Sequence, residues 1–296
     1  MIRRPIATAL AAALLLSTAA CGDDDTSSSP DASSTGVEDA PERIVSMSAS
    51  STEMLFAIGA GEQVVAADQQ SNFPPEAPTT DLSAYEPNLE AIATYEPDLV
   101  IVSSDELEEG LVALGIDVYV APAAEELEDV YEQLEELGEL TGHADEAAGV
   151  VEDIQDDLAE LVEEVPERDE PLTYFHELDD MLYSVTSDTF IGALYELAGL
   201  ENVADAADAD GQSGGYPQLS AEFLIEADPD LIFLADTKCC AQDAATVGAR
   251  PGFAVLSAVT NGRVIALDDD VASRWGPRIV DLFRLIVESV KAVPAT

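Results

Sequence analysis

The sequence predicts an α/β fold of two similar lobes, each built on a mostly parallel sheet, joined by one long helix. Three observations support this prediction. The chain repeats one helix–turn–strand unit, apolar strands alternate with amphipathic helical segments, and a single uninterrupted helical period lies between the two copies of the unit. Sheets of this kind need helices on both faces, and the alternation supplies them.

The repeat joins residues 88–102 to residues 220–234. Each segment reads as a short helix, a Pro-Asp turn and a buried strand. At a constant offset of 132 residues, Glu90 aligns with Glu222 and Pro97 with Pro229. Upstream of each copy lies an amphipathic helix that ends at a glycine, as helices commonly do. The chain therefore contains two copies of one α/β unit.

Seven short segments are apolar on both faces, which is typical of strands buried within a parallel sheet. They are residues 43–47, 64–67, 99–102, 118–121, 172–175, 231–234 and 264–267.

The segment between the copies predicts one long helix. From Ala147 to Val165 apolar residues recur at steps of three and four, and no Gly or Pro interrupts them between Gly149 and Pro166. A coiled coil would show the same spacing, but fewer than four heptads fit before Pro166. A single helix bridging two lobes, within residues 143–166, is the better interpretation.

The N-terminus predicts export. Arg3 and Arg4 precede an apolar run from Ile6 to Leu16, small residues follow, and then comes Cys21. This pattern resembles a bacterial lipoprotein signal, although Thr18 stands where such signals usually carry Leu. The resemblance implies a signal peptide at residues 1–20, an acylated Cys21, and an extracytoplasmic protein held at the membrane by lipid. An ordinary cleaved signal with an incidental cysteine is the alternative.

Composition divides the rest of the chain and excludes some partners. Residues 21–41 contain almost no large apolar side chain, so we expect a flexible tether. We expect an N-terminal lobe at 42–142 and a C-terminal lobe at 167–296. Apart from Arg3 and Arg4, the chain has 9 basic side chains and 61 acidic ones. That balance excludes nucleic acid as a partner and would repel an anionic bilayer.

Several segments together resemble the class III bacterial solute-binding proteins, the receptors for cobalamin and ferric siderophores. Besides the repeat, they are 177–179, 183–192 and 261–265. The resemblance covers nearly the whole mature chain. It implies a monomer that captures a metal chelate between its lobes and delivers it to the dimeric permease of an ABC importer.

In this family a glutamate on each lobe binds arginines of the two permease subunits, and the matching positions here are Glu90 and Glu222. The repeat selects the same two residues independently. A receptor with two equivalent lobes can present one acid to each subunit of a symmetric permease. Any single acid among 61 is otherwise expected to be solvated surface.

Ligands of open parallel sheets bind beyond the carboxyl ends of the strands. The aromatic residues Tyr85 and Tyr216 precede the two repeat helices, and Arg274 and Trp275 stand together after the last strand. We expect these four residues to bind the ligand, with the indole facing a ring and the guanidinium neutralising an anion. Alternatively, 273–277 begins a helix, Trp275 covers the core and Arg278 pairs with a carboxylate.

Cys239 and Cys240 leave two possibilities open, a vicinal disulfide or two free thiols. A metal site would need more ligands, and only His143 and His176 exist. We therefore expect no bound metal and no cofactor, and a hydrogen-bonding role for His176 rather than ligation.

Rival functions have less support. The sequence holds no nucleophile elbow, phosphate loop or glycine-rich dinucleotide motif, so we do not expect an enzyme. A receptor for haem or a free metal ion, and a surface scaffold lipoprotein without a ligand, remain the alternatives.

Overall fold

A computed structural model of the chain describes residues 40–294, all of which belong to one compact unit. The predicted signal peptide, Cys21 and all but the last two residues of the predicted tether lie outside the described residues. No helix in the described range 40–294 is long and apolar enough to cross a membrane.

The first half of the described chain forms a parallel sheet in the order β2-β1-β3-β4. Its strands are β1 (Ile44–Ser46), β2 (Val64–Ala67), β3 (Leu99–Val102) and β4 (Asp117–Val120). The helices between them are α1 (Ala49–Ala57), α2 (Leu89–Ala93) and α3 (Glu108–Ala113), with short 3-10 turns at Ala60–Gln63 and Asp105–Leu107.

The second half repeats this topology, with a parallel sheet in the order β6-β5-β7-β8. Its strands are β5 (Thr173–Glu177), β6 (Glu201–Asn202), β7 (Leu231–Leu234) and β8 (Val264–Ala266). Its helices are α6 (Phe190–Leu197), α7 (Ala221–Ala227), α8 (Ala244–Ala249), α9 (Ser257–Thr260), α10 (Asp269–Ala272) and α11 (Ile279–Lys291), with 3-10 turns at Val203–Ala207 and Phe253–Val255.

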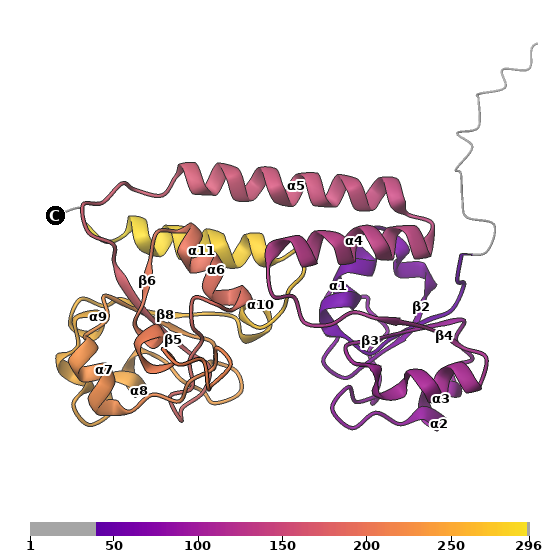
Figure 1. Ribbon diagram of the computed structural model, residues 1–296, viewed down its shortest axis with the longest axis horizontal. Helices are drawn as coiled ribbons and strands as arrows, with labels where there is room; N and C mark the ends of the chain where they lie inside the picture. The colour runs from indigo at the N-terminus through magenta and orange to yellow at the C-terminus, as the bar shows by residue number, and fades with distance from the viewer. Residues whose placement is uncertain (1–39, 295–296) are drawn as a thin grey trace, which may run out of the picture. The chain divides into compact units, whose positions relative to one another are not determined.

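Two long helices follow β4 in the chain: α4 (Leu127–Thr141), which belongs to the first half, and α5 (Ala144–Glu163), which joins the halves. Helix α5 packs against α4 of the first half and against α11 of the second (Figure 1). Its buried residues are those of the predicted apolar stripe, Ala147, Val151, Ile154, Leu158 and Leu161. The predicted fold class is confirmed, while the lobe boundaries at 42, 142 and 166 stay a prediction because the described residues form one unit.

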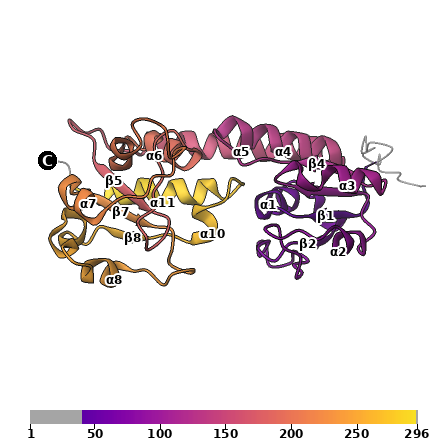
Figure 2. The same ribbon diagram turned by 60° about the horizontal axis from the view of Figure 1, so that its bottom comes forward.

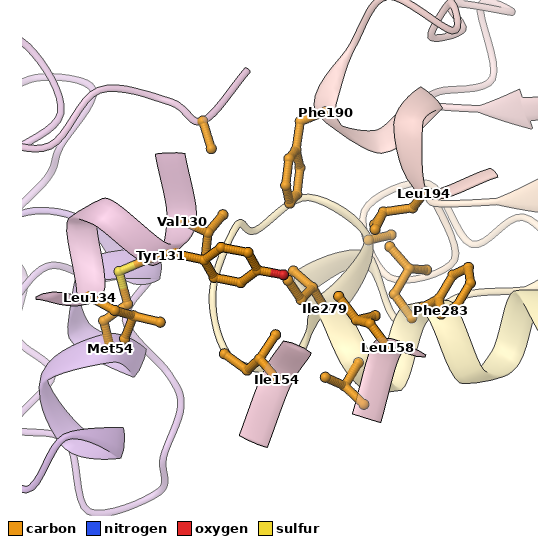
Figure 3. Packing of buried hydrophobic residues seen from close by; sticks show 14 of the residues in the cluster. Met54, Val130, Tyr131, Leu134, Ile154, Leu158, Phe190, Leu194, Ile279 and Phe283 are labelled. Atoms are coloured by element: carbon orange, nitrogen blue, oxygen red, sulfur yellow. The ribbon is translucent and has the colours of Figure 1, made fainter. Parts of the chain in front are cut away.

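Each sheet is covered on both faces, as its apolar strands require (Figure 2). In β7, Leu231 and Phe233 belong to the cluster that contains α5, α6 and α11, whereas Ile232 and Leu234 pack with α7 and α8. The first cluster continues into the other half, so one apolar core runs through α1, α4, α5, α6 and α11 (Figure 3).

The repeated unit has the same local contacts in both copies. Asn88 and Ser220 are the N-caps of α2 and α7, and each side chain accepts a hydrogen bond of 3.1 Å from a backbone N–H of the first turn. Asp98 and Asp230 each accept from the backbone N–H where a central strand begins, at 2.9 Å from Arg43 and 3.1 Å from Thr173. The aspartate of each Pro-Asp turn therefore joins two strands of its own sheet.

Candidate ligand-binding cleft

A cavity of about 300 Å³ lies at the carboxyl ends of β1, β2 and β3 and is closed on one side by residues of the second half. Ligands of parallel sheets bind at such strand ends. The first half contributes Met47, Ser48, Ala49, Ser50, Asp68, Gln70, Ala84, Tyr85 and Ser103. The second half contributes Asp270, Ser273, Arg274 and Trp275.

Buried polar side chains support the wall beside β1. The hydroxyl of Thr52 donates to Ser46 and lies 2.8 Å from the hydroxyl of Ser71. Ser71 in turn lies 2.6 Å from Asp68, which lines the cavity. All four side chains are buried, so these hydrogen bonds hold Asp68 in one orientation.

Arg274 lies in the cavity wall, but its charge is already neutralised. Its guanidinium donates to Glu53 at 2.8 Å and to Asp270 at 3.0 Å, and the side chain is 8% exposed. Two more acceptors, Gln70 O and Asn72 Oδ1, complete its hydrogen bonds across the halves. The structure therefore gives Arg274 the role of joining the halves, and little of its charge is left for a ligand.

Asp270 is held by several positive or hydrogen-bonding neighbours. Burial raises the pKa of Asp270. Hydrogen bonds from Lys238 and Asn72 and the charge of Arg274 lower it by more, so this pKa lies below its ordinary value. Lys238 also binds Asp268, at 2.5 Å. Lys238 is thus paired with both carboxylates.

Trp275 contacts both the core and the cavity. It is half-buried, packs against the main core and lines the cavity. Its indole nitrogen donates to Gln133 of α4 at 3.2 Å, and its backbone N–H donates to Ser50 at 3.3 Å. These two bonds fix the ring in the wall.

Arg278 pairs with a carboxylate, as one of the two sequence interpretations proposes. Its Nε donates to Glu53 at 2.8 Å and its Nη2 donates to the same carboxylate. The hydrogen bond that Arg278 donates to Glu53 also raises the pKa of Arg278. The guanidinium stacks over Phe73 at 4.1 Å from the ring centre.

The two tyrosines lie in different settings. Tyr85 is 80% exposed and lines the cavity beside Trp275. Tyr216 is 50% exposed and does not line the cavity. The structure thus brings together three of the four residues expected to bind a ligand.

The two expected docking acids occupy matching positions. Glu90 lies in the first turn of α2 and Glu222 in the first turn of α7, and both are exposed. In Figure 1 each helix lies on the side of its own sheet away from the long helices. A carboxylate in the first turn is favoured by the helix dipole and stays available to a partner.

A second polar cluster lies at the carboxyl ends of β5 and β7. Glu177 and Asp236 are both fully buried, and Arg250 makes a two-pronged ion pair with Glu177. Both acids come shortly after predicted strands, 172–175 and 231–234, but the sequence gives no sign of their pairing, because 59 residues separate them and 73 separate Glu177 from Arg250. Glu53 was missed for the same reason.

The cysteines and histidines of the described range form no metal-binding cluster. Cys239 and Cys240 are free thiols, the second of the two possibilities left open by the sequence, while Cys21 lies outside the described residues. His176 is buried, with its Nδ1 2.8 Å from the Tyr195 hydroxyl. Within residues 40–294, no three His, Cys, Asp or Glu side chains are placed to hold a metal ion.

The sequence profile described as "Periplasmic binding protein" matches residues 44–271, which span both sheets. The chain belongs to this family. Members are binding proteins for transport rather than enzymes, and one relative is named for ABC transport. The chain is therefore an extracytoplasmic solute-binding protein.

Relatives of known name cover most of the chain. The "Uncharacterized ABC transporter substrate-binding lipoprotein YvrC" of Bacillus subtilis is 27% identical over 86% of this chain and 81% of its own length. The "Cobalamin-binding protein" of Halobacterium salinarum is 31% identical over 85% of this chain and 70% of its own.

A solved structure shows the same fold. The periplasmic vitamin B12 binding protein BtuF of Vibrio cholerae superposes with a TM-score of 0.69 and 25% identity, covering 85% of this chain and 97% of that one.

Proposed function

We propose that the chain is a lipid-anchored receptor that captures a metal chelate in the cleft and delivers it to an ABC importer. The observation that carries the proposal is the cavity at the strand ends, which both halves line and which contains an indole and a tyrosine ring. Among the described residues that line it, Arg274 is the only cation, and it is already paired with two carboxylates.

This charge pattern favours cobalamin over an anionic siderophore. The periphery of the corrin ring carries amides, which serine hydroxyls and aromatic faces can bind without a free cation. A tris-catecholate complex or the propionates of haem would instead need an unpaired cation. The names of the relatives from Halobacterium and Vibrio point to the same cargo.

The size of the cavity limits how the cargo is held. A volume of about 300 Å³ is at the low end for small-molecule sites. A bulky chelate would therefore enter with one part of its edge, against Trp275 and Tyr85, and would remain partly outside the cavity.

Delivery would use Glu90 and Glu222. Both are exposed acids in the first turn of equivalent helices, so a permease dimer could bind one with each subunit.

Acylation of Cys21 would keep the receptor near that permease. Labelling with an alkyne fatty acid should mark the wild type and not the Cys21→Ala variant; an unlabelled wild type would remove the anchor from the proposal.

Isothermal titration calorimetry tests the cargo directly. We expect cyanocobalamin to bind with a Kd of about 1 μM or tighter, and ferric tris-catecholate, a ferric hydroxamate and haem to bind more weakly. The fluorescence of Trp275, the single tryptophan, should be quenched on binding, with free tryptophan at the same ligand concentrations as the control for absorption by the ligand.

Each outcome identifies a different function. Tight binding of a ferric chelate or haem in place of cobalamin would change the cargo and keep the receptor. Binding of none of the four, with unchanged thermal stability, would favour a surface scaffold.

A further inference from the structure

The buried acids Glu177 and Asp236 lie at the ends of neighbouring strands. β5 and β7 are parallel neighbours, Glu177 pairs with Leu234 in their register, and Ala235 N donates to Glu177 O at 2.9 Å. Asp236 follows directly. Neither acid has measurable exposure to solvent. Two carboxyl groups are therefore buried side by side, outside the cavity described above.

One cation lies beside the two acids, and of the two it binds only Glu177. Arg250 donates to both oxygens of Glu177, at 2.6 and 2.5 Å, and to Gln242 at 2.8 Å. Both oxygens of Asp236 lack a hydrogen-bond partner among the described residues. With both acids ionised, the cluster would hold an uncompensated buried charge beside another anion, which is strongly unfavourable.

We infer that Glu177 and Asp236 form a proton-binding site, in which a protonated Asp236 donates a hydrogen bond to Glu177 below neutral pH. One proton neutralises the Asp236 carboxylate and lets it donate a hydrogen bond to Glu177, the partner that it otherwise lacks. Burial, followed by the charge of Glu177, raises the pKa of Asp236 to about 7. The arrangement matches other pairs of carboxylates that share one proton.

The other described groups around the site supply no unpaired cation, because Lys238 of the same loop binds Asp268 and Asp270. His176 beside Glu177 is neutral, because burial lowers its pKa to about 3. On the loop, the hydrogen bond with Cys240 raises the pKa of the Cys239 thiol to about 12. The remaining charged neighbours are both acidic: Asp180 lies near Arg250, and Asp269 lies near Cys239.

The site lies under the loop that leads from β7 to α8. The backbone carbonyl of Asp236 accepts from Cys240 N at 3.2 Å and from Gln242 N at 3.3 Å. The same loop carries Lys238, which binds Asp270 in the cavity wall at 2.7 Å. Loss of the proton would leave a buried negative charge on Asp236. Opening of this loop would let water reach that charge.

Protonation of Asp236 makes the stability of the folded state depend on pH. A carboxyl whose pKa is raised by folding stabilises the folded state at low pH, below its ordinary pKa of about 4. That stabilisation declines as the pH rises toward 7 and is lost above it. The loop at residues 237–242 should therefore open more often at pH 8.5 than at pH 5.5.

The carbon-13 NMR spectrum of full-length protein labelled at the aspartate carboxyl carbons tests the site. One resonance should titrate near pH 7 and should be absent from Asp236→Asn, whose amide can donate to Glu177 without a proton. Amide exchange within 237–242, corrected for the intrinsic dependence on pH, should accelerate at least threefold from pH 5.5 to 8.5 in the wild type and not in the variant.

The exposed Asp210→Asn substitution is the matched control and should retain the resonance near pH 7. The inference would be overturned if every aspartate resonance titrated below pH 5, a result that requires no variant to fold. It would also be overturned if 2 mM CaCl₂ or 1 M NaCl lowered the midpoint by more than one pH unit relative to choline chloride, because a metal cation would then occupy the place of the proton.

Discussion

The carboxylate of Glu53 on α1 accepts a hydrogen bond of 2.8 Å from Arg274, a residue 221 positions later in the chain. The two side chains are 2% and 8% exposed, and Arg278 binds the same carboxylate. One acid of the first half thus binds two arginines of the second half, next to the cavity. The halves are held together there by ion pairs, in addition to the apolar core along the long helices.

Replacement of Glu53 should strongly destabilise the fold. Glu53→Gln preserves the shape but leaves two largely buried guanidinium groups without their shared anion. Removal of one partner of a buried ion pair costs about 3 kcal/mol or more. Urea unfolding, followed by Trp275 fluorescence, measures the change.

The exposed pair of Glu164 and Lys291, 2.7 Å apart, provides the control, and Glu164→Gln should leave the unfolding midpoint unchanged. Equal midpoints for both variants would show that the Glu53 cluster contributes no net stability.

Reversal of both docking acids should abolish uptake without changing ligand affinity. Glu90→Arg and Glu222→Arg place cations where arginines of the permease are expected, and like charges at an interface repel. Transport by cells carrying the double variant should fall to the background of cells without the receptor, while calorimetry on the purified protein should give the wild-type Kd.

The control is Glu139→Arg with Glu160→Arg, which makes the same change of charge at exposed positions on α4 and α5. If both double variants transport alike, then Glu90 and Glu222 do not dock the permease.

Acid should destabilise the protein through His176. Folding lowers its pKa from about 6.5 to about 3 by burial, so the unfolded chain binds a proton that the folded chain does not. Stability from this residue is complete above pH 6.5 and declines as the pH falls toward 3, with a slope of up to about 1.4 kcal/mol per unit.

His176→Gln keeps a polar group near the Tyr195 hydroxyl but cannot titrate. Its unfolding free energy should fall less steeply than that of the wild type between pH 6.5 and 4, with pH 8 as the reference for the cost of the substitution itself. Parallel curves would contradict the assignment of a neutral buried imidazole.

The sequence predicts the fold well because the determining signals are local. Seven predicted strands match observed ones to within two residues, and the apolar stripe of α5 matches its buried face. The exception is β6, missed because two residues, Glu201 and Asn202, are too short to show a pattern.

The candidate site is less predictable because its contacts are distant in sequence. Arg274 and Trp275, which the sequence singles out, line the cavity, but nothing near them in the sequence shows that Glu53 neutralises the arginine. Asp236 is one acid among 61, and only the tertiary structure shows that it is buried without a partner.

The repeat also aligns two residues with left-handed backbone, Glu96 and Asp228, at φ values of 48° and 44°. A side chain in this conformation costs about 1 kcal/mol, which glycine avoids. Glu96→Gly should therefore raise the unfolding free energy, by roughly 0.5 kcal/mol after the greater entropy of the unfolded glycine is subtracted.

Asp228→Gly should instead lower it, because the Asp228 carboxylate accepts hydrogen bonds from Ser257 N at 2.6 Å and Ser257 Oγ at 2.7 Å. Thermal unfolding of the two variants tests this asymmetry. The same shift in both would show that the Ser257 contacts do not contribute.

The formal net charge of −50 should make stability depend on salt. Most acids of α4 and α5 are exposed and lie within a few turns of one another, so they repel one another in the folded state and less in an expanded chain. Raising NaCl from 0.1 to 1 M shortens the screening length from about 10 to about 3 Å. We expect the Tm to rise over this range, and to rise equally in choline chloride if screening is the cause. A rise confined to NaCl would indicate specific sodium binding, whereas a Tm independent of both salts would show that repulsion among the surface acids does not limit stability.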